Sequence, residues 1–252
     1  DNVFGYSVCI SGNVIIVGAY GDDWGGNNGA GAAYIYRYDG SAWNEEQKLL
    51  ANDGSFIDYF GSSVSISGNT AIVGADNNDD FGYETGAAYI YRFNGSEWVQ
   101  EEKLLASDGA SYDYFGQSVS ISGDTVAVGA CNDQYTSSKP GSVYIYRFNG
   151  SGWVEEEKLT QGVHPDLDRF GESVSISGEI VIVGAHFESE DGTGSSSGSS
   201  YVYRFDGNNW IQEAKLVASD GENSHHFGYD VCISEENVII GAWGDNYNGS
   251  AT

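Results

Sequence analysis

Acidic side chains gather in the irregular segments of this 252-residue chain, and they are the first candidates for chemistry. Asp76, Asp79 and Asp80 stand close together in one segment, and Asp22 and Asp23 stand in another. Carboxylate oxygens are ligands that Ca²⁺ and Mg²⁺ prefer. A plain solvated loop is the favoured interpretation, and a weak calcium or magnesium site at Asp76, Asp79 and Asp80 is the alternative.

Aromatic and histidine residues in similar segments suggest other kinds of chemistry. Trp24, Tyr135 and Trp243 carry large rings that can stack on sugars, although packing within their own loops is the simpler interpretation. His186 is a candidate acid or base. Asp245 follows Trp243 in the same segment. Together with the five aspartates above, these residues are the candidate binding positions.

The motifs of common catalytic sites do not occur in the sequence. It contains no Gly-x-Ser-x-Gly elbow, no His-Glu-x-x-His pair and no glycine-rich phosphate loop between a strand and a helix. Paired carboxylates arise by chance in a chain with 37 acidic residues. We therefore expect no catalytic residues and no enzymatic activity. A hydrolase that uses His186 or His164 is the least favoured alternative.

One repeated unit must position all of these residues. The Phe-Gly pairs lie 56, 55, 55 and 57 residues apart, at Phe4-Gly5, Phe60-Gly61, Phe115-Gly116, Phe170-Gly171 and Phe227-Gly228. A fixed period of this size indicates a supersecondary unit that buries its apolar face by stacking on copies of itself. We interpret residues 1–252 as one domain, or a fragment of one, with repeats starting near residues 4, 60, 115, 170 and 227.

Each unit has the pattern of four strands. In the second, residues 63–67 alternate serine with branched residues, residues 70–75 are mostly apolar, and residues 88–93 alternate in the period of a strand. Asn94-Gly95 is a strong hairpin signal. Residues 98–105 form a more polar fourth strand, which we expect at the outer edge.

The pattern predicts an all-β fold. No useful window shows helical spacing, and 36 glycines suit many tight turns. Four-stranded antiparallel blades of about 55 residues, stacked radially, describe a β-propeller of which four and a half repeats are present. A flat β-solenoid is the alternative.

The paired motifs resemble a known family. Phe-Gly opening the first strand and Gly-Ala closing the second, as at Gly74-Ala75, look like FG-GAP repeats, the units of the integrin α-subunit propeller. The sequence of the repeats is most similar to that of secreted or surface FG-GAP proteins of bacteria and algae. The resemblance covers the whole chain and implies a propeller in an extracellular interaction or adhesion protein.

Two departures from the family pattern concern the candidate sites. The proline after Gly-Ala is replaced at each of its five positions by another residue, Tyr20, Asp76, Cys131, His186 or Trp243. The integrin-type calcium loop is replaced by a short turn such as Ser67-Gly68-Asn69, which cannot supply six to eight oxygen ligands. We therefore expect no calcium at that family position and no certain cofactor.

The chain ends within its fifth repeat, after the second strand. We expect a piece of a longer polypeptide or assembly, with seven blades by resemblance to integrins. A five-bladed ring with a thin last blade is the alternative.

Composition restricts the partners. With 37 acidic and 10 basic residues the net charge is −27, which repels nucleic acid and anionic membranes. No stretch approaches the length of a membrane span. The odd count of three cysteines argues for small buried thiols, and equivalent positions on adjacent blades, such as Cys9 and Cys232, should lie too far apart for a disulfide. Asn94, Asn149 and Asn248 each begin a glycosylation sequon, which is used only if the source is a eukaryote.

Antiparallel order places the long, variable connections at one end of the propeller and the tight turns at the other. Variable loops on a rigid scaffold are where specificity normally lies. We therefore predict a secreted or cell-surface interaction module whose acidic loop face binds a protein partner. A lectin with several shallow sugar pockets is the alternative.

Overall fold

The structure is a computed structural model that describes residues 2–23, 28–131, 141–161, 168–189 and 196–244. These residues form β-strands and no helix, which confirms the all-β prediction. The strands are grouped in sequence order into four sheets of four and a final pair. Their bounds are β1 (Val8–Ser11), β2 (Val14–Ala19), β3 (Ala32–Tyr38), β4 (Trp43–Leu49), β5 (Ser63–Ser67), β6 (Thr70–Ala75), β7 (Ala87–Phe93), β8 (Trp98–Leu104), β9 (Ser118–Ser122), β10 (Thr125–Ala130), β11 (Ser142–Phe148), β12 (Trp153–Leu159), β13 (Val174–Ser177), β14 (Ile180–Ala185), β15 (Ser199–Phe205), β16 (Trp210–Leu216), β17 (Phe227–Ser234) and β18 (Asn237–Ala242).

Each sheet is one blade, and its strands pair in the order in which they occur. All pairings within the blades are antiparallel, as in β5–β6, β6–β7 and β7–β8 of the second blade. The outer strand is always the fourth, as its polar pattern predicted. The fifth blade contributes β17 and β18.

The core lies between blades rather than within one. A single apolar cluster combines Ile16 and Ile35 of the first blade with Val64, Val73 and Tyr89 of the second. Similar clusters join the second blade to the third and the third to the fourth. Each blade therefore buries its apolar face against its neighbour, as the repeat period predicted.

The phenylalanines of the three central Phe-Gly pairs, Phe60, Phe115 and Phe170, belong to this core. Phe60 is fully buried, with its ring centroid 5.4 Å from that of Tyr89 and 6.0 Å from that of Tyr91. Its backbone amide donates to the carbonyl of Ala30 in the preceding blade. The Phe-Gly pair thus fixes one blade onto the loop of the blade before it.

Serines on the inner strands join successive blades. The hydroxyl of Ser65 accepts a hydrogen bond from the amide of Ile121 at 3.2 Å, and Ser120 accepts one from Ile176 at 3.0 Å. Ser118 donates to the carbonyl of Gly171 at 2.7 Å. The alternation of serine with branched residues therefore satisfies backbone groups across each junction while the branched side chains fill the core.

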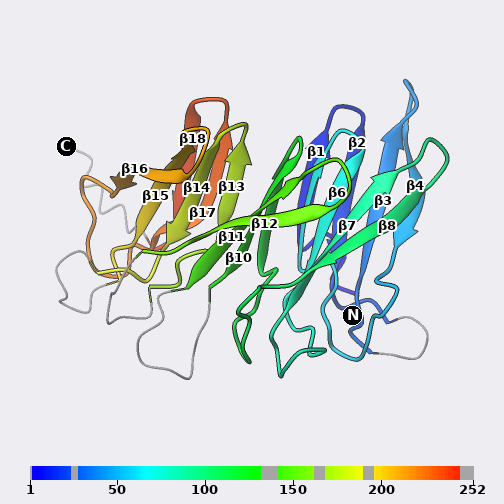
Figure 1. Ribbon diagram of the computed structural model, residues 1–252, viewed down its shortest axis with the longest axis horizontal. Coiled ribbons are helices and arrows are strands. Elements are labelled where there is room, and N and C mark those ends of the chain that lie inside the picture. The colour runs from blue at the N-terminus through cyan, green and yellow to red at the C-terminus, as the bar shows by residue number, and fades with distance from the viewer. Residues whose placement is uncertain (1, 24–27, 132–140, 162–167, 190–195, 245–252) are drawn as a thin grey trace, which may run out of the picture.

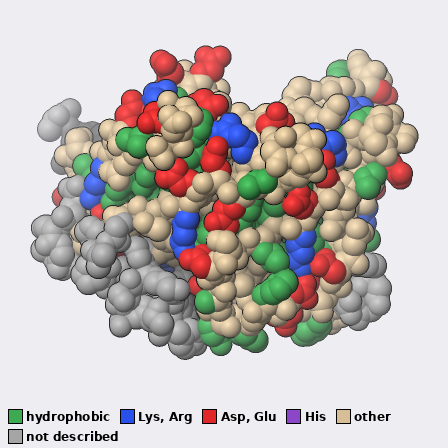
Figure 2. Space-filling view, viewed as in Figure 1, with side chains coloured by type: hydrophobic (Ala, Val, Ile, Leu, Met, Phe, Trp, Pro, Cys, Tyr) green, Lys and Arg blue, Asp and Glu red, His purple; other side chains and the backbone are tan. Residues whose placement is uncertain are grey.

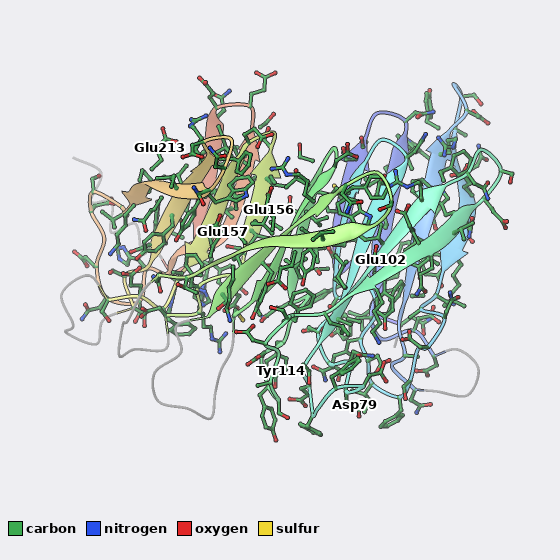
Figure 3. All side chains as sticks on the ribbon, viewed as in Figure 1. Asp79, Glu102, Tyr114, Glu156, Glu157 and Glu213 are labelled. Carbon is green, nitrogen blue, oxygen red and sulfur yellow. The ribbon has the colours of Figure 1, made fainter. Side chains whose placement is uncertain are left out.

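A second set of contacts joins the outer strands. The Arg92 guanidinium pairs with Glu101 at 2.8 Å and lies 4.7 Å from the ring centroid of Phe148 in the third blade. The indole nitrogen of Trp153 donates to Glu101 at 3.2 Å, and its backbone amide donates to Glu102. Figure 3 shows Glu102, Glu156 and Glu157 on the outer strands β8 and β12. Arginine and glutamate of one blade thus hold phenylalanine and tryptophan of the next.

The outward face of the first blade lacks this cover. Phe4, Val8 and Ile10 are exposed, whereas the corresponding Phe60, Val64 and Ile66 are buried. Cys232 of the fifth blade is also exposed, so the expectation of a buried thiol is wrong there. Cys9 is half-buried, and all three cysteines are free, in agreement with the expectation that Cys9 and Cys232 lie too far apart for a disulfide.

The two ends of the blades differ. Figure 1 shows the short turns, such as β1–β2 and β13–β14, at the upper end, and the longer connections at the lower end. We call the lower end the loop face. It is the face on which the variable segments of the sequence lie.

Candidate binding face and axial hollow

Two variable positions of each blade meet beside the inner strands. The residue that follows Phe-Gly contacts the residue that follows Gly-Ala in the same blade. Tyr6 meets Tyr20 with ring centroids 4.7 Å apart, and Tyr229 meets Trp243 at 5.9 Å. The thiol of Cys131 is hydrogen-bonded to Gln117. We call these paired positions the collar, and its remaining pairs are Ser62 with Asp76 and Glu172 with His186.

A hollow of about 370 Å³ opens inside the collar, and we call it the axial hollow. All five blades contribute to it at the same position of their first strands, which places these strands around a common axis. Its polar lining consists of Tyr6, Ser7, Ser62, Ser63, Gln117, Ser118, Glu172, Ser173, Tyr229 and Asp230. The repeated fold therefore surrounds one site with five different sets of side chains.

The collar contains titratable groups with displaced pKa values. Burial is the main cause that raises the pKa of Asp76 to about 6, and one of its carboxylate oxygens is buried with no hydrogen-bond partner. Burial also raises the pKa of the Glu172 carboxyl, against the opposing effect of Arg169. These groups gather where the sequence departs from the family pattern.

His186 is almost fully buried beside Glu172. Its Nδ1 lies 3.4 Å from the Glu172 carboxylate, and its ring centroid lies 5.6 Å from that of His226. Burial, followed by the nearby charges of Arg169 and His226, lowers the pKa of His186 to about 4. The imidazole is therefore neutral at pH 7, so this pair forms no strong ion pair.

Trp243 reaches the same region from the last blade. Its ring stacks on His226, with the centroids 5.1 Å apart and the planes at 4°. The structure therefore brings together three predicted site residues, Asp76, His186 and Trp243, as members of one collar.

The acidic residues of the first loop have internal roles. Asp22 is buried and accepts hydrogen bonds from Tyr34 at 2.7 Å and from Lys48 at 2.8 Å. Asp23 accepts the backbone amide of Gly29 at 2.8 Å. These two carboxylates position their own loop and the outer strand.

The three aspartates of the second blade have different surroundings. Asp76 belongs to the collar, Asp79 is exposed, and Asp80 is paired with Lys103, which also contacts Asp53 at 2.8 Å. In the part of the chain that the structure describes, no group of three or more His, Cys, Asp or Glu side chains is arranged to hold a metal ion. Calcium at Asp76, Asp79 and Asp80 stays a prediction.

A further surface on the loop face was missed by the sequence analysis. Phe56, Phe81 and Tyr83 are 59%, 69% and 59% exposed. A small hollow of about 140 Å³ is lined by Phe56, Ile57, Asn77, Asp79, Tyr83 and Glu84. We call Phe56, Phe81, Tyr83 and Asp79 the aromatic patch. In the sequence, the one indication of this surface is that Phe81 and Tyr83 flank a glycine in a polar loop.

Figure 2 shows hydrophobic side chains along the loop face and mixed charges over the blades above it. Figure 3 places Asp79 and Tyr114 at the loop face. Tyr114 is hydrogen-bonded to Glu84 in the loop of the preceding blade, which anchors the residue next to Tyr83 of the aromatic patch to the following blade.

Four predicted positions, Trp24, Tyr135, Asp245 and Asn248, lie outside the described residues, as does His164. The other two sequons lie in turns between outer strands. Asn94 Oδ1 accepts the backbone amides of Ser96 at 2.9 Å and Glu97 at 3.1 Å, and Asn149 makes the same contacts in the third blade. Their side chains hold the turn, whether or not they are modified.

Four-stranded blades around a polar hollow, with variable loops at one end, form a β-propeller arrangement. The model of the FG-GAP repeat matches residues 1–36, 43–91, 98–146, 153–203 and 210–252. The chain therefore belongs to the FG-GAP repeat family. Each complete matched unit begins in an outer strand and ends in the third strand of the following blade, so the sequence unit links two blades.

Repeats of this family build propeller modules for interaction and adhesion and are typical of extracellular proteins. Among the described residues, no helix is long and apolar enough to span a membrane.

Proposed function

We propose that the chain is a non-enzymatic interaction module of a secreted or cell-surface protein, and that its loop face binds a protein partner. The observation that carries this proposal is the aromatic patch on an otherwise strongly acidic molecule. Exposed aromatic residues are enriched at protein interfaces because they bury a large apolar area at a small entropic cost.

The contacts of the patch favour a preformed surface. Tyr83 packs against Tyr112 with the ring centroids 5.1 Å apart, and Tyr112 donates its backbone amide to the Tyr83 carbonyl at 2.9 Å. The connection that carries Tyr112 thereby supports the loop that carries Phe81 and Tyr83. A rigid patch loses little freedom on binding, which favours affinity.

The carboxylates beside the patch suggest the charge of the partner. Asp79 and Glu84 line the small hollow, and the chain as a whole carries a net charge of −27. A partner surface with a positive charge and exposed apolar side chains would complement both features, and its association would slow as salt is added.

Affinity capture from the native extracellular material tests the proposal. The immobilised chain is expected to retain a partner that the triple variant Phe56→Ser, Phe81→Ser, Tyr83→Ser loses. A matched control replaces three similarly exposed apolar residues of the outer strands, Val99→Ser, Val154→Ser and Ile211→Ser. Equal capture by the loop-face variant, or loss of capture in the control alone, contradicts the proposed surface.

A further inference from the structure

We propose that the axial hollow is a binding site for a neutral saccharide. This inference concerns a different surface from the aromatic patch and a different class of ligand, so it goes beyond the proposed function. It also differs from the several shallow pockets expected for a lectin with one site per blade.

The shape of the axial hollow suits a small ligand. Its volume of about 370 Å³ lies within the range of about 300–1,000 Å³ that is usual for ligand pockets. Inner strands from all five blades line it, and serine contacts join each of the first four blades to the blade that follows it. A ligand would therefore meet a single site per molecule with walls that are already in place.

Two aromatic rings stand at the rim. Tyr6 and Tyr229 both line the axial hollow, and both are held by edge-to-face contacts with other rings. Tyr6 is held by Tyr20, while Tyr229 lies 5.1 Å from His186 and 5.9 Å from Trp243. Fixed, partly exposed rings of this kind provide apolar faces against which the carbon–hydrogen faces of a sugar can pack.

Polar groups complete the lining. Asp230 is exposed at the rim, and Glu172 supplies a second carboxylate that is paired with Arg169 at 3.1 Å. Gln117 supplies an amide and Ser62 supplies a hydroxyl. Hydroxyl groups of a saccharide can donate to the carboxylates and accept from the amide and the serine.

The charge of the lining determines which saccharides are accepted. No lysine or arginine is among the described residues that line the axial hollow, whereas two carboxylates are. Arg169 offsets the charge of Glu172, so the repulsion of sialylated or sulfated sugars comes from Asp230 and from the net charge of −27 of the chain. The structure therefore predicts a preference for neutral glycans over acidic ones.

A printed array of neutral and acidic glycans, probed with the labelled full chain at physiological salt, provides the test. We expect retention of neutral glycans, followed by measurable binding of the strongest one in calorimetry. The variants Tyr229→Ala and Asp230→Ala are each expected to weaken this binding at least tenfold. Asp230 is exposed, so the thermal midpoint of unfolding of Asp230→Ala should stay within about 2 °C of that of the parent, as for most surface substitutions, and this variant separates lost binding from lost folding.

The matched control is Tyr83→Ala, which removes a tyrosine that is 59% exposed, compared with 48% for Tyr229, from the aromatic patch and should leave glycan binding unchanged. Three results overturn the proposal. They are an array with no glycan retained, a preference for acidic glycans, and binding that survives in both hollow variants. None of them affects the protein-binding proposal, which depends on Phe56, Phe81 and Tyr83.

Discussion

Gly74 is in direct backbone contact with Gly116 of the next blade, so close that a β-carbon on Gly74 would lie 2.0 Å from the Gly116 carbonyl oxygen. The same contact joins Gly129 to Gly171 and Gly184 to Gly228, again at 2.0 Å. The glycine of Gly-Ala and the glycine of the following Phe-Gly are thus two sides of one junction.

Gly74→Ala should destabilise the chain because a methyl group would force the second and third blades apart. We expect a loss of about 3 kcal/mol or more in the free energy of unfolding, at the upper end of the range for overpacking. Urea denaturation measures it. Gly152→Ala is the control, because the nearest atom to its new β-carbon is a side-chain oxygen at 3.6 Å, and it should change stability by less than about 1 kcal/mol. Equal losses in the free energy of unfolding for the two variants would contradict the close contact between Gly74 and Gly116.

Trp153→Ala and Trp43→Ala remove the same side chain from the same position of two blades. Trp153 is 5% exposed and donates to Glu101, whereas Trp43 is 42% exposed. We expect a loss of about 3–5 kcal/mol for Trp153→Ala and below about 1 kcal/mol for Trp43→Ala. Thermal unfolding of both variants makes the comparison, and similar losses would show that the outer contacts between blades contribute little.

Asp76→Asn should alter the pH dependence of stability. Its folded pKa of about 6 lies above the ordinary value of 3.8, so the folded state holds the proton more tightly. Stability therefore falls as the pH rises from about 4 to about 6, and the loss is complete above pH 7. The variant should be more stable than the parent at pH 7.5, by on the order of 2 kcal/mol, and equal to it at pH 4.

Denaturation at the two pH values checks this expectation. Asp79→Asn removes one negative charge from the same loop at an exposed position, so it should shift stability by the same small amount at both pH values. An Asp76→Asn variant that gains nothing at pH 7.5 would show that the buried carboxylate is not a source of strain.

Asn149→Asp should leave the third blade intact, whereas Asn149→Ala should weaken its turn by about 1 kcal/mol. Asp39 and Asp206 occupy the corresponding turns and accept the same backbone amides. The contacts of Asn149 use Oδ1, so a glycan on Nδ2 leaves them in place. Unfolding of the unmodified variants tests the turn, and glycosidase treatment of chain secreted from eukaryotic cells tests Asn94 and Asn149. An Asp variant as unstable as the Ala variant would contradict this account of the turn.

The sequence predicted the strands well because its signals were local and repeated. Residues 88–93 were expected as the third strand of the second blade and Ala87–Phe93 is observed, while residues 98–105 were expected as the fourth and Trp98–Leu104 is observed. Period-two alternation and the Asn-Gly turn determine such elements within a few residues. Because the unit is repeated, a strand that is ambiguous in one copy can be assigned from the other copies.

The site was less predictable because its residues are joined across long stretches of chain. Asp22 was a candidate ligand, yet Lys48 from the outer strand neutralises it. Phe56 and Tyr83 lie on different connections and line one hollow only after two blades have packed. Similarly, the five residues that replace proline could be recognised in the sequence. Their contacts with the residues that follow Phe-Gly could not, because these positions are brought together only by the fold.

The serine contacts run in one direction along the chain. Ser65, Ser120 and Ser175 each accept an amide of the following blade. A blade therefore has a forward side and a backward side that are not interchangeable. Insertion or removal of one whole repeat would keep this donor and acceptor at every junction, because each repeat carries both the accepting serine and the donating amide.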